Sequence, residues 1–282
     1  MRIDSHQHFW DYAAHAGDYV WMSAEQGMLR RNFLPEDLAP LLRQTGFDGT
    51  VAVQAREMVA ETDFLLGLAA RTPWILGVVG WIDLCAPDAE ALIERYAAEP
   101  KLKGLRLIIH DHPDPEFAAS PAHVRGVGWL ARHGLTYDLL LKPRDIRPSI
   151  RLVDQHPDQR FVVDHIAKPS LAPGGLSPWR EDIRELARRP NVWCKISGLV
   201  TLADWAAWTP EQFTPCLDLV LEAFGADRLM AGSDWPVCTC AASYARTMQV
   251  ALDWSARLSP AERAAFLGGT CARFYNLAPL SS

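Results

Sequence analysis

Short runs of aliphatic and β-branched residues alternate along the whole chain with longer stretches in which apolar residues recur at three- and four-residue spacing. The short runs indicate buried strands and the longer stretches indicate amphipathic helices, which is the pattern of βα units around a parallel sheet. Eight strands are expected, centred near Ile3, Val53, Val78, Leu107, Leu139, Val162, Cys194 and Met230. The alternation therefore predicts an α/β protein.

The helices between these strands carry start and stop signals. Pro35 begins one helix and Gly46 ends it, because proline fits the first helical turn and glycine accepts the left-handed conformation that follows the last turn. The other helices are expected at 61–71, 87–98, 122–133, 146–155, 179–189, 211–224 and 241–257. No linker or low-complexity segment interrupts the series, so residues 1–282 are expected to form one domain.

Two architectures fit alternating strands and helices: a closed (β/α)8 TIM barrel and an open, doubly wound sheet. The open sheet usually carries a glycine-rich, phosphate-binding turn after its first strand, whereas this turn reads His-Gln-His-Phe-Trp. The barrel is therefore expected, and 282 residues are enough to form it. The segment 9–33 is too long for a simple βα connection, so we expect it to lie over the site as a lid-like loop.

Composition and charge narrow the range of partners. Hydrophobic residues make up 49% of the chain and charged residues 22%, which suits a large globular core. The formal net charge of −6, without a run of Lys or Arg, gives no footprint for nucleic acid or an anionic membrane. No leader-like segment or membrane span is recognisable. A cytoplasmic protein with a small-molecule partner is expected, and its oligomeric state stays open.

Polar residues recur at the predicted strand ends, where reactive groups of a βα barrel lie. His6 and His8 end the first strand, and their two-residue spacing puts both side chains on one face, where they suit one metal ion or one substrate. His165 ends the sixth strand and Asp234 the eighth. Burying such groups costs several kcal/mol unless they are paired, which favours function over the alternative of structural caps. Arg106, a cation in an apolar strand, either neutralises the carboxylate or binds a substrate oxygen.

Aromatic and hydrogen-bonding side chains also lie at predicted strand ends. The candidates for substrate binding are Trp10, Gln54, Trp81, His110, Lys195 and Trp235. Aromatic faces suit the C–H surfaces of a sugar ring, and the polar groups can bond hydroxyls. These residues favour a neutral polyol, although packing in the core or rim is the alternative for each tryptophan.

Five motifs, spread over nearly the whole chain, carry a resemblance to a known family. They are His-Gln-His-Phe-Trp, Lys-Gly-Leu-Arg, Asp-His-Ile-Ala-Lys-Pro, Lys-Ile-Ser-Gly and Gly-Ser-Asp-Trp-Pro. In this order they resemble the amidohydrolase superfamily, and within it the branch of sugar-lactone and pyrone lactonases. The resemblance implies a barrel hydrolase that acts on the ester bond of a sugar-acid lactone. It further implies that Asp234 is the general base toward water, with His6, His8 and His165 around it.

One departure from the superfamily pattern concerns metals. Binuclear members place a bridging Lys or Glu on the fourth strand, where this chain has Arg106, and the fifth-strand histidine is replaced by Leu139 and its neighbours. A guanidinium stays protonated and cannot ligate a metal, so a two-metal centre is not expected. The remaining choices are no cofactor, or one divalent ion held by His6, His8 and Asp234, with zinc as the first choice.

Two rival functions stay open. Metal-dependent nonoxidative decarboxylases of the same superfamily resemble this pattern in a His-x-His, a later histidine and a late aspartate, but they need a tightly held ion. A noncatalytic small-molecule binder has no chemical need for an aspartate and three histidines at one mouth. A pyrone dicarboxylate is the less favoured lactone, because the cations near the strand ends are chiefly Arg106, Lys168 and Lys195.

Overall fold

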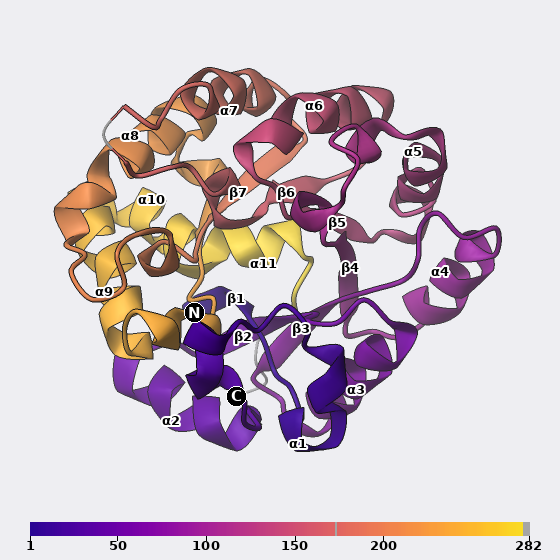
Figure 1. The fold of residues 1–282 in the computed structure, drawn as a ribbon, viewed down its shortest axis with the longest axis horizontal. Coiled ribbons are helices and arrows are strands. Elements are labelled where there is room, and N and C mark those ends of the chain that lie inside the picture. Colours follow the sequence, from indigo (N-terminus) through magenta and orange to yellow (C-terminus); the bar gives the residue numbers. More distant parts are fainter. Residues whose placement is uncertain (173, 279–282) are drawn as a thin grey trace.

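Eight parallel strands pair in sequence order into one sheet. The structure is a computed structural model that describes residues 1–172 and 174–278. The strands are β1 (Ile3–Gln7), β2 (Gly49–Val53), β3 (Ile75–Gly80), β4 (Leu102–Leu107), β5 (Thr136–Leu139), β6 (Phe161–Val163), β7 (Val192–Ile196) and β8 (Leu229–Ala231). They curl into a nearly closed barrel inside a ring of helices (Figure 1). The TIM-barrel prediction is confirmed, and every predicted strand centre lies in its strand.

The barrel closes where β1 meets the residues just after β8. The amide of Asp234 donates to the carbonyl oxygen of His6 at 2.8 Å, and the amide of His8 donates to that of Trp235 at 2.7 Å. Gln7 and Trp235 form a parallel bridge between these two segments. The main-chain bonds that close the barrel therefore also fix the first-strand histidines beside Asp234.

The outer helices follow the predicted series closely. They are α2 (Pro35–Thr45), α3 (Val59–Arg71), α4 (Ala89–Ala97), α5 (Pro121–Val127), α6 (Ile146–Gln155), α7 (Trp179–Ala187), α8 (Thr214–Phe224) and α9 (Tyr244–Trp254). Gly46 ends α2 in the left-handed conformation, with φ 73°. The strands between these helices are buried along almost their whole length, as expected for a parallel sheet covered on its outer face.

Several predicted helices are too long at their ends, and two of them differ most from the structure. The helix predicted at 122–133 stops at Val127 and is followed by a separate 3-10 turn at Ala131–His133, because Gly126 and Gly128 weaken the helix there. The helix predicted at 241–257 begins only at Tyr244 and ends at Trp254, since the Ser243 side chain accepts a hydrogen bond from Arg246 N and caps the first turn.

The C-terminal segment forms helices that the sequence pattern did not predict. α10 (Pro260–Ala264), a π-helical turn at Ala265–Gly269 and α11 (Thr270–Phe274) lie one after another, and α11 crosses the centre of the view in Figure 1. A Cβ on Gly268 would lie 2.4 Å from the carbonyl oxygen of Met1, so this segment packs tightly against the amino end of β1. From here the Tyr275 hydroxyl donates to Asp138 Oδ2 at 2.7 Å.

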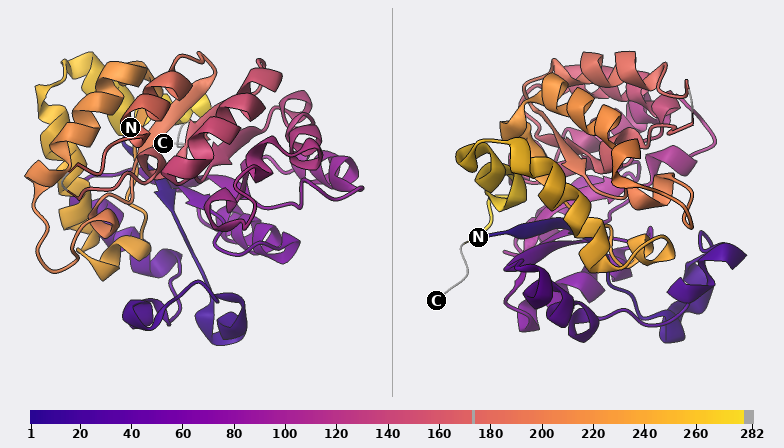
Figure 2. Two further views of the ribbon diagram at one scale, coloured as in Figure 1. Left: turned by 45° about the horizontal axis from the view of Figure 1, so that its top comes forward. Right: turned by 90° about the vertical axis from the view of Figure 1, so that its left-hand side faces the viewer.

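The segment 9–33 leaves the barrel after β1 and stands out from it, at the opposite end from the N-terminus (Figure 2). It contains α1 (Tyr12–His15) and two 3-10 turns, at Ala16–Asp18 and Ala24–Leu29. Trp10 holds the segment together, because its indole Nε1 donates to the carbonyl oxygens of Leu29 and Arg31 at 3.2 and 2.9 Å. Within the described residues, no helix is long and apolar enough to span a membrane.

Replacing Tyr275 by Phe tests whether the C-terminal segment supports the barrel interior. The change removes a hydroxyl that bonds the buried Asp138 carboxylate, and leaving such a group short of a donor costs about 1–3 kcal/mol. We expect urea denaturation to show a loss of that size. Tyr12→Phe is the control, because Tyr12 is only partly buried and lies in the segment 9–33. Equal unfolding free energies for Tyr275→Phe and the unmodified protein would contradict the expectation.

Candidate active site

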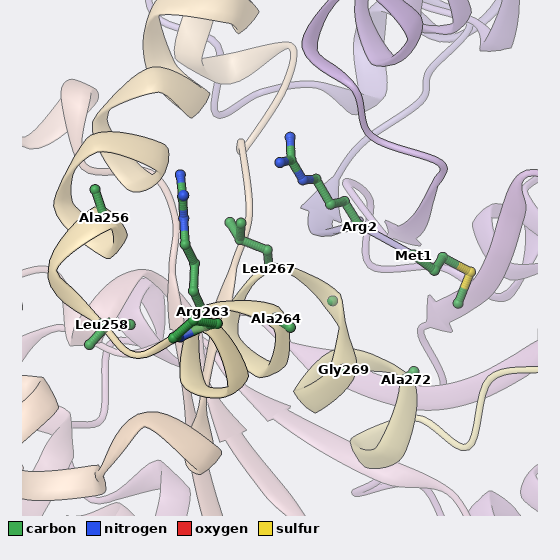
Figure 3. Close-up of a pocket in the computed structure, with 11 residues that line it drawn as sticks. Met1, Arg2, Ala256, Leu258, Arg263, Ala264, Leu267, Gly269 and Ala272 are labelled. Atoms are coloured by element: carbon green, nitrogen blue, oxygen red, sulfur yellow. The ribbon is translucent and has the colours of Figure 1, made fainter.

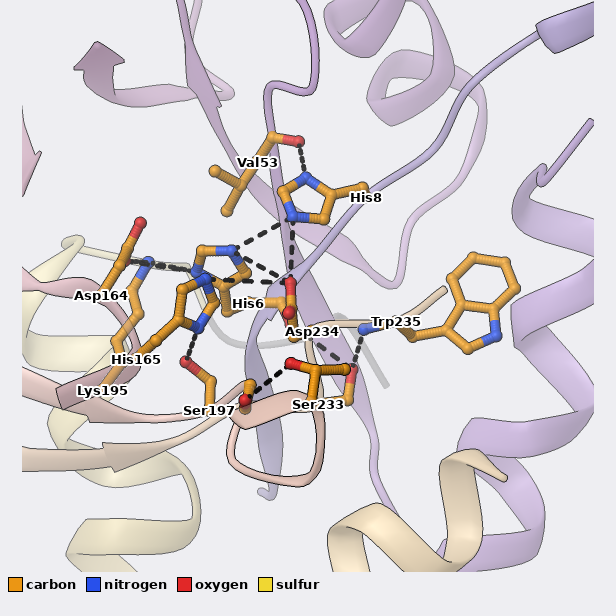
Figure 4. A network of polar contacts seen from close by, with 12 residues as sticks. His6, His8, Val53, Asp164, His165, Lys195, Ser197, Ser233, Asp234 and Trp235 are labelled. Atoms are coloured by element: carbon orange, nitrogen blue, oxygen red, sulfur yellow. Dashed lines mark hydrogen bonds and ion pairs between the residues drawn. The ribbon is translucent and has the colours of Figure 1, made fainter. Parts of the chain in front are cut away.

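The five residues predicted to carry chemistry meet at the carboxyl ends of their strands, and Figure 4 shows four of them, His6, His8, His165 and Asp234. Asp234 Oδ1 lies 3.3 Å from His8 Nε2, 3.8 Å from His6 Nε2 and 3.9 Å from His165 Nε2. Arg106 Nη1 lies 3.3 Å from His6 Nε2. Because parallel strands end at one edge of the sheet, residues more than 200 positions apart in the chain come into contact there.

The hydrogen-bond partners of the two first-strand histidines fix where their protons sit. His8 Nδ1 lies 2.8 Å from the carbonyl oxygen of Val53, which can only accept, so Nδ1 carries the hydrogen. Arg106 can only donate, so His6 Nε2 accepts, while its Nδ1 lies 3.3 Å from Asp164 Oδ1 and 3.2 Å from Lys195 Nζ. Burial lowers the pKa of His6 well below its usual value, against the opposing charge of Asp164, and keeps its ring neutral. Both Nε2 atoms therefore present a lone pair to the site.

His6, His8 and Asp234 form a group that fits one divalent ion. Their ligand atoms are 3.3 to 3.8 Å apart, and with both imidazoles neutral no hydrogen lies between these three acceptors. A cation removes the repulsion between them. Ligand atoms around a tetrahedral zinc ion are about 3.3 Å apart, and two imidazoles with a carboxylate are a usual zinc set. The predicted ligand group is thus compatible in both chemistry and spacing with a single ion.

His165 lies in a strained turn after β6. His165, Ile166, Ala167 and Lys168 have φ values of 54°, 48°, 58° and 49°, and the left-handed region costs roughly 1–2 kcal/mol for each residue other than glycine. Trp179 Nε1 donates to the carbonyl oxygen of Ile166 at 2.7 Å and helps to hold the turn. The turn buries Ile166 and Ala167 completely, while His165 and Lys168 line a cavity.

Two residues after β7 hold the His165 ring in place. Ser197 Oγ lies 2.9 Å from His165 Nδ1. Gly198 has φ 64°, and a Cβ at this position would lie 2.7 Å from His165 Nδ1 and 3.2 Å from Asp234 Oδ2. The Lys-Ile-Ser-Gly motif therefore supplies a hydrogen bond and the space that the imidazole needs.

Beneath these residues lies a set of four buried charges, here called the charged floor: Arg106, Asp138, Asp164 and Lys195. Lys195 Nζ pairs with Asp138 Oδ2 at 2.5 Å and with Asp164 Oδ1 at 3.0 Å. Arg106 Nη1 pairs with Asp164 Oδ2 at 3.0 Å. Two cations face two carboxylates, which is the condition under which buried charges are tolerated.

Two of the predicted substrate-binding residues belong to this floor and its support. Lys195 is fully buried, with its ammonium enclosed by Asp138 and Asp164. Gln54 is also fully buried, and its Oε1 accepts from Arg106 Nη2 at 2.9 Å. Both side chains are already bonded to other buried residues, so contact between them and a substrate is not supported. Sequence reasoning missed Asp138 and Asp164, although Asp164 stands next to His165 in a motif that it used.

A cavity of about 250 Å³ opens above the reactive residues. Its charged and imidazole-bearing lining consists of His8, Arg106, His110, Asp111, His165, Lys168 and Asp234. The segment 9–33 contributes Trp21 and Gln26 to the wall, and neither was predicted. His110 is 8% exposed, with its Nδ1 free of any hydrogen-bond partner among the described residues. Burial lowers the pKa of His110 to about 3, so its ring is neutral and can bond a hydroxyl.

None of the three predicted tryptophans lines this cavity. Trp10 is fully buried within the segment 9–33, and Trp235 is 2% exposed and packs edge-on against Phe9 and Phe33. Trp81 is half-buried beside α3, where its main chain bonds the hydroxyl of Thr62. All three tryptophans therefore fit the alternative of packing in the core or rim. The aromatic side chain that lines the cavity is Trp21 instead.

A larger hollow of about 690 Å³ lies at the opposite end of the barrel, around Met1, Leu258 and Ala272 (Figure 3). Its ionisable side chains among the described residues are Arg2 and Arg263. Within the described part of the chain, no carboxylate or imidazole lines this hollow, so these residues lack the acid–base groups of the smaller cavity. Chemistry rather than size therefore identifies the candidate active site.

Gly198→Ala tests the space that the imidazole needs, with Gly134→Ala as its matched control. Gly134 has φ 70° and nothing within 4 Å of a built Cβ, so both variants meet a left-handed backbone but only Gly198→Ala meets a neighbour. We expect Gly134→Ala to lose about 1 kcal/mol of stability in thermal unfolding and Gly198→Ala to lose more, because its Cβ also meets the imidazole. Zinc affinity, measured by competition with a chromophoric chelator, should fall at least tenfold only for Gly198→Ala. Equal zinc affinity in the two variants would show that Gly198 does not shape the site.

Known proteins match this chain over nearly its whole length. Residues 3–277 match the family model described as amidohydrolase. An L-fucono-1,5-lactonase of Burkholderia multivorans is 43% identical over 98% of this chain and 96% of its own length, and one of Burkholderia ambifaria is 36% identical over the same shares. A crystal structure of a Burkholderia multivorans amidohydrolase with bound zinc is 44% identical, with a TM-score of 0.93 over 99% of this chain and 100% of that one. The chain belongs to the amidohydrolase family.

Proposed function

We propose that this protein is a lactonase that hydrolyses a sugar-acid lactone, L-fucono-1,5-lactone or a related aldonolactone, to the open hydroxy acid. The observation that carries the proposal is the Asp234 carboxylate, which lies within 3.3 to 3.9 Å of three imidazoles at a cavity for one small molecule. The relatives named L-fucono-1,5-lactonase match over 98% of the chain, which supports this substrate. The reaction belongs to cytoplasmic carbohydrate catabolism, such as L-fucose degradation.

Asp234 is the general base of the proposed reaction. Burial raises the pKa of its carboxyl, but the neighbouring rings of His165 and His8 and the charge of Lys168 together hold that pKa below its ordinary value of 3.8. The group is therefore a carboxylate at neutral pH and can accept a proton from water as the water oxygen attacks the ring carbonyl. The same proton can return to the ring oxygen when the ring opens.

His6, His8 and Asp234 would hold a single divalent ion, with zinc as our choice because a 44%-identical relative binds zinc. When bound, such an ion supplies a Lewis acid for the carbonyl oxygen and for water. Arg106 does not ligate; it adds a permanent positive charge beside His6, which supports negative charge on an oxygen above it. His165, held by Ser197, keeps the carboxylate in place from the other side.

The lining of the cavity favours a neutral ring with hydroxyls over a dicarboxylate. Neutral His110 offers an unpaired Nδ1, while Ile108, Leu140 and Val237 give an apolar wall. Arg106 is already engaged by Gln54 and Asp164, and Lys195 is enclosed in the charged floor. One cation of the lining is then left to bind an anionic group of a substrate. One cation is too few for the two carboxylates of a pyrone diacid.

The direct test is a pH-indicator assay on a panel of L- and D-sugar lactones, with metal content determined and with chelated and zinc-reloaded samples compared. We expect rapid acid release from L-fucono-1,5-lactone or a close relative, and much slower release from pyrone dicarboxylates. The absence of acid release from every lactone, with and without zinc, would overturn the proposal. Carbon dioxide release from aromatic carboxylates, or ligand-induced stabilisation without turnover, would then identify the decarboxylase or the binder.

Asp234→Asn tests the general base. The amide keeps the size of the side chain but cannot accept the proton, and positioned proton transfer is worth about 10²- to 10⁴-fold in rate. We expect kcat on the best lactone to fall by that factor. Asp227→Asn is the control, because Asp227 is exposed at the opposite end of β8. Normal turnover in Asp234→Asn at full metal content would exclude Asp234 as the base.

A further inference from the structure

Lys168 is a cation at the cavity that the mechanism above leaves without a partner. Its side chain lines the cavity together with His165 and Asp234. Among residues 1–172 and 174–278, no side chain forms a hydrogen bond or a close ion pair with its ammonium, although the more distant charges of Asp234 and Asp111 favour its charged form. Two other lysines near the site do have carboxylate partners: Lys142 pairs with Asp111, and Lys195 pairs with Asp138.

The backbone that carries Lys168 is strained in a way that places its side chain in the cavity. Lys168 is the last of four consecutive residues with positive φ, and its amide donates to the carbonyl oxygen of His165 at 2.8 Å. This reversal of the backbone buries the side chains of Ile166 and Ala167 in the core. It places the side chain of Lys168 at the cavity, beside that of His165. Strain of this kind persists where the surrounding structure enforces it, and it clusters at functional sites.

Lactone hydrolysis places negative charge on two oxygens in turn: the carbonyl oxygen when water attacks, and the ring oxygen when the ring opens. In the proposed reaction the first oxygen is assigned to Arg106 and to the ion that His6, His8 and Asp234 would hold. The second has no cation from these residues. Among the described residues that line the cavity, Lys168 is the cation with no carboxylate of its own.

We propose that Lys168 binds the ring oxygen of the lactone and stabilises the charge on it as the ring opens. This inference rests on the proposed function. The water oxygen bonds to the carbonyl carbon and gives a proton to Asp234; the bond between that carbon and the ring oxygen then breaks. The ring oxygen leaves with its electron pair, hydrogen-bonded to the Lys168 ammonium, and takes the proton back from Asp234. Lys168 keeps its charge throughout, and the product is the hydroxy acid.

Lys168→Gly separates a chemical role from a structural one. Glycine is the residue that favours φ 49°, so the variant removes the ammonium while relieving the backbone. We expect unchanged or higher thermal stability and normal zinc content, with kcat about 10²- to 10³-fold lower, the loss typical for one donor to a developing oxyanion. KM should change by less than about tenfold, because the interaction strengthens as the bond breaks. A structural role would instead lower stability or zinc content together with kcat.

Four further measurements make the test specific to the ammonium. Ethylammonium should restore part of the kcat of Lys168→Gly in a concentration-dependent way, and tetramethylammonium, which has no N–H, should not. Lys168→Met should lose kcat similarly. Lys103→Met should not, because Lys103 lies at the amino end of β4 and its ammonium contacts the carbonyl oxygen of Asn276.

The outcomes separate this inference from the proposed function. If the unmodified protein hydrolyses a sugar lactone and both Lys168 variants keep kcat within about threefold, the role of Lys168 is refuted and the lactonase stands. Loss of kcat in Lys168→Gly without rescue by ethylammonium, or with loss of zinc, also refutes it. If the unmodified protein hydrolyses no lactone at all, the proposed function itself fails.

Discussion

The arrangement of the site depends on the pairing of buried charges in the charged floor. Lys195 lies between Asp138 and Asp164, and Arg106 completes the set from the other side. Each of these charges would be costly to bury alone, and each becomes tolerable because an opposite charge meets it within 3.0 Å. Asp164 then has a fixed position, with its Oδ1 3.3 Å from His6 Nδ1. The geometry of the reactive group follows from this electrostatic constraint.

The floor links the site to parts of the chain far from it. Tyr275, from the C-terminal segment, reaches Asp138 from the opposite end of the barrel, so the helices that cover the bottom also support the residues under the site. At the top, the main-chain bonds between β1 and the residues after β8 hold His6 and His8 beside Asp234. The site is therefore fixed from below by charge pairing and from the side by barrel closure.

Above the charged floor, the backbone adopts conformations that cost local stability but place side chains at the cavity. The turn at 165–168 puts four residues without glycine in the left-handed region, and Gly198 leaves the space into which the His165 ring fits. A relaxed backbone would not present His165 and Lys168 to the same cavity. The segment 9–33 adds Trp21 and Gln26 as the outer wall, so the cavity has a charged base, a polar side and an apolar side suited to one small, hydroxylated ring.

The sequence by itself determined the eight strands, most of the helices and the polar residues that meet at the barrel mouth. Hydrophobic periodicity is a local property of the sequence, so it locates the strands and helices. Because the carboxyl end of each strand marks the barrel mouth, His6, His8, Arg106, His165 and Asp234 could be found without coordinates. Their recurring motifs also indicated the family, which the comparisons confirm.

Only the tertiary structure decided which polar and aromatic residues face the cavity. Lys195 and Gln54 lie at strand ends as predicted, yet they point to buried partners on other strands, and Trp10 and Trp235 pack into the core. Conversely, Asp138 and Trp21 gain their places at the site from contacts between segments far apart in the chain. The physical reason is that burial and charge pairing are properties of the folded neighbourhood, whereas periodicity gives only the direction of a side chain relative to its own element.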